Sequence, residues 1–162
     1  MKTGITSRQV LEFRSDNSSV SISGTAEGLT WLAQKCFVLV DAERRNHFHL
    51  ADYFVLTAQS QNAVLELLPD RRSLWERIVN QGTKFTRPDF SQGNIEFTEY
   101  AGELHIYGTL QGLAWLARKC LVLVDTERPG QIRFEDFGVL TRQSKRPTLA
   151  FVSQLPKATN EC

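Results

Sequence analysis

The sequence contains one long segment twice. When the chain is shifted by 84 positions, residues 24–60 align with residues 108–144, and 21 of these 37 positions are identical. Two unrelated sequences would share roughly 2 or 3 residues over that length. The chain is therefore a tandem duplication, and a fold that suits one copy must also suit the other.

Each copy has the hydrophobic pattern of two strands, one helix and two further strands. Residues 11–14 and 19–24 alternate apolar and polar around a Ser-Asp-Asn-Ser turn, and the second copy repeats this pattern around Ala101-Gly102. Apolar residues then recur at helical spacing from Leu29 to Val40, and again from Leu113 to Val124. Two more strands are expected near 47–51 and 64–68, and near 131–135 and 148–152.

This order predicts an α+β fold of two tandem ββαββ units related by pseudo-two-fold symmetry. Each unit is expected to contribute one helix, lying on one face of an antiparallel sheet. We divide the chain into a first unit over residues 1–69, a partly helical linker over 70–92, a second unit over 93–156 and a mobile tail over 157–162.

Both predicted helices are apolar nearly all round. Trp31, Phe37 and Val38 lie off the main apolar stripe of the first helix, and the second copy repeats the pattern. Something must cover this second side. We expect the two helices to cover each other, with Trp31 and Trp115 near the seam between them. The alternative is a binding groove for another protein.

Composition and charge exclude several classes of protein. Nineteen Lys and Arg against eighteen Asp and Glu give a net charge of +1, which disfavours nucleic acid or an anionic membrane as partner. The first residues contain no apolar run of secretory length, and no segment reaches the roughly 18 apolar residues of a membrane span, so we expect a cytoplasmic protein. Three widely spaced cysteines predict reduced thiols, with Cys36 and Cys120 buried in the helices.

No motif nominates a catalytic, cofactor or metal site, and we expect none. The chain has no Gly-rich phosphate loop, Cys-x-x-Cys pair or nucleophile elbow. His47 and His49 lie two residues apart on one strand face, which suits two metal ligands. His105 belongs to the hairpin of the other unit and supplies no convincing third ligand, so solvent-exposed histidines are expected.

Two further motifs occur in both copies. Asp-x-Glu-Arg ends each predicted helix and includes Glu43 and Arg44 in the first copy; it is interpreted as surface polarity or a partner contact rather than as a catalytic carboxylate pair. Thr-x-Gln-Ser follows each third strand at 57–60 and 141–144, where the hydroxyls are expected to satisfy backbone groups in a turn.

The residues of the first copy resemble a known family. Residues 22–33 contain Gly-Leu-x-x-Leu-Ala, and a histidine strand at 47–50 and Ser60 follow. This arrangement resembles immunity protein family thirty-two of bacterial polymorphic toxin systems. The present chain differs in carrying two units, and its second unit has Gln131 and Arg133 in place of the histidines. The resemblance implies a cytoplasmic protein without chemistry of its own, which binds a cognate toxin domain and blocks its active site or the approach of its substrate.

The leading hypothesis is therefore an immunity protein, present as a monomer or in a complex with its toxin. Candidate contact residues lie on the third strands, at the first helix exit and in the linker, where arginines surround a tryptophan: His47, His49, Arg133, Glu135, Glu43, Arg44, Arg71, Arg72 and Trp75. The alternatives are a self-associating structural or regulatory module, a nucleic-acid-binding saddle formed by one continuous curved sheet, and an enzyme with a polar pocket between the units.

Overall fold

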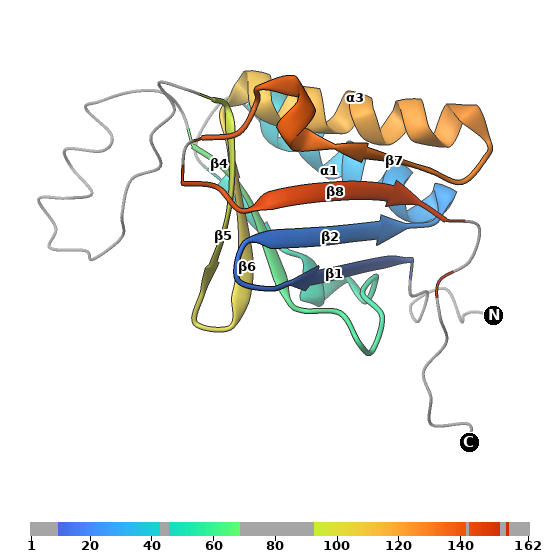
Figure 1. Ribbon diagram of the computed structural model, residues 1–162, viewed down its shortest axis with the longest axis horizontal. Coiled ribbons are helices and arrows are strands. Elements are labelled where there is room, and N and C mark those ends of the chain that lie inside the picture. Colours follow the sequence, from blue (N-terminus) through green and yellow to red (C-terminus); the bar gives the residue numbers. More distant parts are fainter. Residues whose placement is uncertain (1–9, 43–45, 69–92, 142, 153–154, 156–162) are drawn as a thin grey trace, which may run out of the picture.

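A computed structural model of the chain describes residues 10–42, 46–68, 93–141, 143–152 and 155. The first repeat contains β1 (Leu11–Ser15), β2 (Ser19–Gly24), α1 (Ala26–Ala42), β3 (Asn46–His49), the 3-10 helix η2 (Leu50–Tyr53) and β4 (Ala63–Leu67). The second repeat contains β5 (Ile95–Tyr100), β6 (Glu103–Gly108), α3 (Leu110–Thr126), β7 (Gly130–Arg133), the 3-10 helix η3 (Phe134–Phe137) and β8 (Arg146–Phe151). The α+β class and the repeated ββαββ order are confirmed (Figure 1). The predicted linker over 70–92 and tail over 157–162 lie outside the described residues.

Each sheet takes strands from both repeats. Sheet A has the order β1-β2-β8-β7, and sheet B has the order β3-β4-β6-β5. The hairpin-like pairs are antiparallel, but the two central pairs, β2 with β8 and β4 with β6, are parallel. The sheets are therefore mixed, and the expectation of purely antiparallel sheets is corrected. Alternation within a strand indicates its buried face but not its neighbour, so the sequence did not reveal these pairings between repeats.

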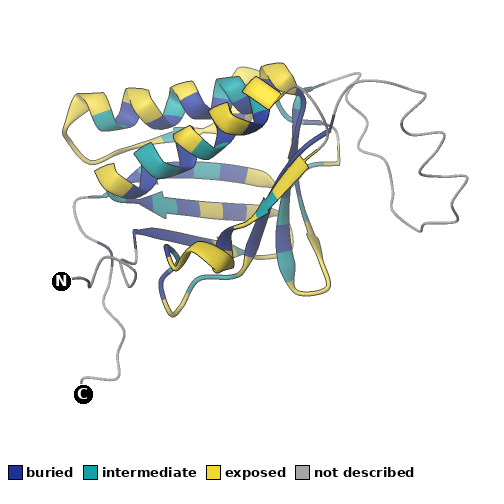
Figure 2. Cartoon of the chain, turned by 180° about the vertical axis from the view of Figure 1, so that it is seen from behind, coloured by how far each residue is buried: buried dark blue, intermediate teal, exposed yellow. Residues whose placement is uncertain are grey.

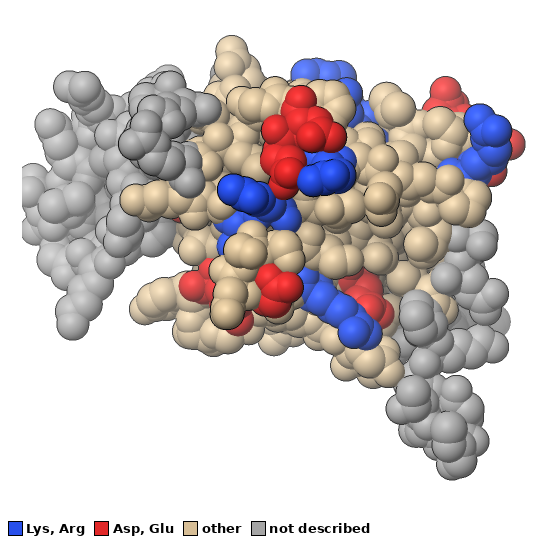
Figure 3. Space-filling model, in the orientation of Figure 1, with Lys and Arg blue, Asp and Glu red and all other residues tan. Residues whose placement is uncertain are grey.

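The two sheets are separate rather than one continuous curved sheet, which removes the basis of the nucleic-acid saddle hypothesis. In Figure 1, sheet A lies face-on and sheet B is seen edge-on at the left. On the face of the molecule shown in Figure 3, Lys and Arg alternate with Asp and Glu instead of forming one basic surface.

The Thr-x-Gln-Ser motifs fasten the turn of each repeat to its first strand. Thr57 donates a hydrogen bond to the buried carboxylate of Glu12 at 2.8 Å, and Ser60 Oγ accepts one from the backbone N–H of Phe13 at 2.9 Å. The second repeat reproduces both bonds: Thr141 to Glu96 at 2.6 Å, and Phe97 N–H to Ser144 at 2.9 Å. The predicted role, satisfying backbone groups, is confirmed for the two serines. It is wrong for the two threonines, whose hydroxyls donate to buried glutamate side chains instead.

The residue after each motif contacts the hairpin turn of the other repeat. Gln61 Nε2 lies 3.4 Å from the backbone oxygen of Gly102, and Lys145 Nζ donates to the backbone oxygen of Asn17 at 3.0 Å. These bonds add polar contacts between the repeats to the strand pairing. Each hairpin turn, β1–β2 and β5–β6, is thus hydrogen-bonded to the other repeat.

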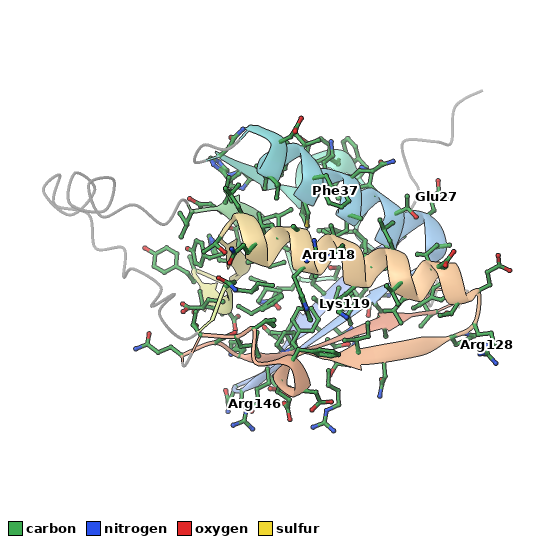
Figure 4. All side chains as sticks on the ribbon, turned by 90° about the horizontal axis from the view of Figure 1, so that it is seen from above. Glu27, Phe37, Arg118, Lys119, Arg128 and Arg146 are labelled. Atoms are coloured by element: carbon green, nitrogen blue, oxygen red, sulfur yellow. The ribbon has the colours of Figure 1, made fainter. Side chains whose placement is uncertain are left out.

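The two helices pack directly against each other and run antiparallel (Figures 1 and 4), as expected from their apolar surfaces. Their inward residues join those of both sheets in one hydrophobic core. Cys36 and Cys120 are buried free thiols within it, as predicted. Burial raises the pKa of Cys36 well above its usual range and that of Cys120 to about 12, so neither thiol is a reactive thiolate at neutral pH. None of the described helices is long and apolar enough to cross a membrane.

The glycine of each Gly-Leu-x-x-Leu-Ala motif permits a close approach between helix and strand. A Cβ atom at Gly28 would lie 2.1 Å from the backbone oxygen of Val10, and one at Gly112 would lie 2.1 Å from that of Asn94. Backbone atoms cannot move aside as a flexible side chain can. The motif therefore encodes a helix start in contact with the chain that leads into β1 or β5, followed by buried leucines and alanine.

We expect Gly28→Ala and Gly112→Ala each to lower the free energy of unfolding by more than about 2 kcal/mol, because the added methyl group overlaps backbone. The matched control is Gly130→Ala, whose Cβ would meet nothing nearer than 3.7 Å and should change stability by less than about 0.5 kcal/mol. Urea unfolding monitored by circular dichroism measures all three. Equal stability of Gly28→Ala and Gly130→Ala would contradict this account of the motif.

Candidate functional site

The two candidate contact histidines, His47 and His49, lie on β3, an outer strand of sheet B, where both are exposed. Their rings form an edge-to-face pair with centroids 4.9 Å apart, as expected for residues i and i+2 on one strand face. Most of β3 and η2 is coloured as exposed in Figure 2. The pair therefore offers imidazole hydrogen-bonding groups to a partner.

His105 lies on the same face of sheet B, contrary to its expected separation from the other histidines. In the register of the sheet, His49 pairs with Val64, and Val64 pairs with His105 on β6. The parallel pairing of β4 with β6 thus brings histidines of both repeats into one row. The sequence could not show this, because the repeat does not reveal which strands pair between the copies.

His105 is largely buried, and neither of its ring nitrogens has a hydrogen-bond partner among the described residues. Its ring stacks on Tyr107 and meets Tyr100 edge-on. Burial is the main cause that lowers the pKa of His105; the nearby His49 adds to the decrease, while Glu103 and Glu66 oppose it. His105 is therefore a neutral imidazole at physiological pH.

Three histidines on one sheet face do not make a metal site here. Within the described part of the chain, no group of three or more His, Cys, Asp or Glu side chains is placed to hold a metal ion. The contacts that the row makes within the described residues are ring contacts, between His47 and His49 and between His105 and the two tyrosines.

In the second repeat, Arg133 and Glu135 form an exposed ion pair, with Arg133 Nη2 2.7 Å from Glu135 Oε2. Arg133 ends β7, and Glu135 lies in η3 rather than on the predicted strand. Because β7 belongs to sheet A and β3 to sheet B, this ion pair and the His47–His49 pair occupy separate sheet edges. The remaining candidates, Glu43, Arg44, Arg71, Arg72 and Trp75, lie outside the described residues.

An aromatic cluster lies between α1 and the segment formed by β3 and η2. Trp31 and Phe48 contact the ring of Tyr53, with centroids 5.4 and 5.9 Å away, and Lys35 Nζ lies 4.7 Å from the centre of that ring. Such cation–π contacts stabilise the packed arrangement. The cluster fixes η2 against α1.

The second repeat builds the same cluster, with Trp115 on Phe134 and Phe137, and Lys119 over Phe137 at 4.7 Å. The expectation that Trp31 and Trp115 lie at the helix seam is therefore wrong. Each tryptophan packs on the 3-10 helix of its own repeat instead. The recurrence of Trp, Lys and an aromatic residue at equivalent positions of both copies is the sequence signal for this cluster.

Within the 37 aligned positions, the two repeats differ most in the segments that these clusters support; before them, residues 14–21 of the first hairpin also share no residue with 98–105. We call residues 46–54 and 130–138 the edge segments. The seven consecutive positions 45–51 contain no residue identical to 129–135, the longest such run within the 37 aligned positions. Exposure alone does not explain this, because the exposed Val38 and Asp41 recur as Val122 and Asp125.

Comparison with models of known families matches the chain to Immunity protein 32 over residues 19–68 and 103–145. The chain belongs to this family. The two matched segments together cover more than half of the chain and fall one in each repeat, so this Immunity protein 32 member carries two family units. Each match includes the helix, the edge segment and the Thr-x-Gln-Ser turn. Comparison with curated proteins finds no match to this sequence.

The buried neutral His105 makes a pH-dependent contribution to stability. Its folded-state pKa is lower than its unfolded value of about 6.5, so the unfolded chain binds more protons below that pH. The contribution is therefore present above about pH 6.5 and is lost as the pH falls. We expect His105→Gln to reduce the loss of unfolding free energy between pH 7.5 and pH 5.

Urea unfolding at the two pH values measures this effect. The control Thr98→Ser lies in the same row of sheet B and changes no titratable group, so it should keep the wild-type pH dependence. An unchanged pH dependence in His105→Gln would show that His105 is not the group responsible.

Proposed function

We propose that this chain is an immunity protein that binds a cognate bacterial toxin domain directly and thereby neutralises it. The observation that carries the proposal is the family match, because it recurs in both repeats and covers the elements that position the exposed edge segments. In this proposal the protein acts by occupying a surface of the toxin and has no catalytic step of its own.

Inhibition by contact requires a surface that keeps its shape. Binding costs less free energy when the contacting residues are already ordered. Both edge segments meet this requirement, since they are exposed yet supported by the packed aromatic clusters and by the helices beneath them. A net charge of +1 supplies no long-range attraction, so affinity would depend on local complementarity of shape and hydrogen bonding.

We assign toxin recognition to the edge segments. The edge segments differ between the two repeats, whereas the core residues, the motif glycines and the turn hydroxyls are the same in both. This pattern is expected when one surface is free to adapt to a partner. In the first segment the candidate contacts are His47 and His49, and in the second they are Arg133 and Glu135. Because the segments lie on different sheets, they offer two chemically distinct contacts.

The test combines the full chain with the toxin domain encoded beside its gene, made inactive for purification. We expect a stoichiometric complex with a Kd of about 1 μM or tighter by isothermal titration calorimetry, and rescue of growth when the active toxin is co-expressed with the chain. The double substitution His47→Ala, His49→Ala should weaken binding at least about tenfold. The control Gln111→Ala, at an exposed position at the start of α3, should not.

Failure of the wild-type chain both to bind and to rescue would reject the immunity proposal. If binding persists in the histidine variant, the two histidines are not the contact, although the wild-type complex would still support the function.

One observation favours a second candidate, a self-associating module. Two apolar side chains of each repeat are exposed on the outer face of the helix pair: Phe37 at 39%, Val38 at 51%, Leu121 at 39% and Val122 at 51%. Figure 4 looks onto this face, with Phe37 and Arg118 labelled. Sedimentation equilibrium distinguishes the two functions: a dimer that Val38→Glu together with Val122→Glu dissociates would favour the module, and a monomer would exclude it.

A further inference from the structure

We propose that Phe54 is the anchor of the toxin-binding surface and inserts into an apolar pocket of the toxin domain; this inference rests on the proposed immunity function. The residue follows η2 directly and closes the first edge segment. Its side chain is 65% exposed, although it is a large apolar ring. The fold therefore leaves most of this apolar ring in contact with solvent.

The backbone of Phe54 is also unfavourable for its residue type. Its φ of 61° and ψ of 30° lie in the left-handed region, which side chains with a Cβ atom rarely adopt. Bulky residues in this region mark turns or sites held under strain. Phe54 thus combines a strained backbone with an exposed ring.

The second repeat contains the unstrained solution to the same turn. Gly138 occupies the position equivalent to Phe54, with φ 66° and ψ 24°, and glycine adopts these angles freely. The residues that follow are Val-Leu-Thr in both copies. The turn therefore requires the left-handed conformation, and only the first repeat places an aromatic ring on it.

The residues on either side of Phe54 fix its backbone. Tyr53, immediately before it, packs on Trp31 and Phe48. The backbone oxygen of Val55, immediately after it, accepts hydrogen bonds from the N–H groups of Val10 and Leu11 at 2.8 and 3.0 Å. With both flanks fixed, the backbone that carries the ring has little conformational freedom left to lose on binding.

These features define the chemistry of the partner. An exposed phenyl ring on a fixed backbone fits an apolar pocket on a folded protein surface, and such buried aromatic anchors supply much of the affinity at interfaces. The exposed carboxylate of Asp52 lies in the same turn, so the rim of the pocket is expected to be basic rather than acidic. The occupant we assign is the cognate toxin domain, and a second copy of this chain is an outcome that the test distinguishes.

The test compares Phe54→Gly, Phe54→Ala and Gly138→Ala with the full wild-type chain, using the inactivated toxin domain as the probe. Phe54→Gly should have an equal or higher Tm, because glycine relieves the strain, and should bind the toxin at least about 30-fold more weakly. Phe54→Ala removes the ring but keeps a Cβ in the left-handed region, so its affinity should fall equally without a rise in Tm. Gly138→Ala should lower the Tm, because alanine is strained at the φ of 66° that glycine adopts freely, and it serves as a control for this backbone effect alone.

The outcomes separate the inference from the function on which it rests. Binding by Phe54→Gly within about threefold of wild type would overturn the anchor while leaving the immunity function standing. Absence of toxin binding by the wild-type chain would overturn both. Self-association that Phe54→Gly abolishes would assign the ring to a second copy and overturn the toxin as its occupant.

Discussion

The parallel pairing between the repeats is the contact on which the rest of the structure depends. It joins β2 to β8 and β4 to β6 at the centre of the two sheets. Without it, the strands would form four two-stranded ribbons, which are marginally stable in water. With it, two four-stranded sheets and an antiparallel helix pair share one core. The duplication therefore produces a single cooperative structure built from both copies.

This arrangement also explains which residues the copies retain. Glu12, Thr57 and Ser60 recur as Glu96, Thr141 and Ser144 because a buried carboxylate and the N–H of a buried phenylalanine need hydrogen-bond partners in both halves. Gly28 and Gly112 recur because the backbone just before β1 or β5 occupies the space of any side chain. Such constraints act equally on the two copies, so the copies remain alike wherever the fold depends on them.

The outer strands β3 and β7 are under a weaker constraint. Each pairs with one strand only and is supported from the side by an aromatic cluster whose members lie mainly on the helix and the 3-10 helix. Their exposed side chains can change without disturbing the core, and here they have become histidines in one copy and an ion pair in the other. The frame therefore keeps its shape while the residues at these edges change.

The sequence by itself determined the duplication, the ββαββ order, the buried face of each helix, the inert thiols and the hydroxyl-supported turns. These properties depend on neighbours in the chain and on which residues avoid water, and both are written in local spacing. The parallel pairing between strands of different repeats, and with it the place of His105 beside His49, became visible only in the folded structure. The same holds for the position of Trp31 and Trp115 away from the helix seam and for the left-handed backbone of Phe54. Those outcomes depend on which surfaces meet across a long separation in the chain, where many pairings satisfy the same hydrophobic pattern and only packing of the whole core selects one.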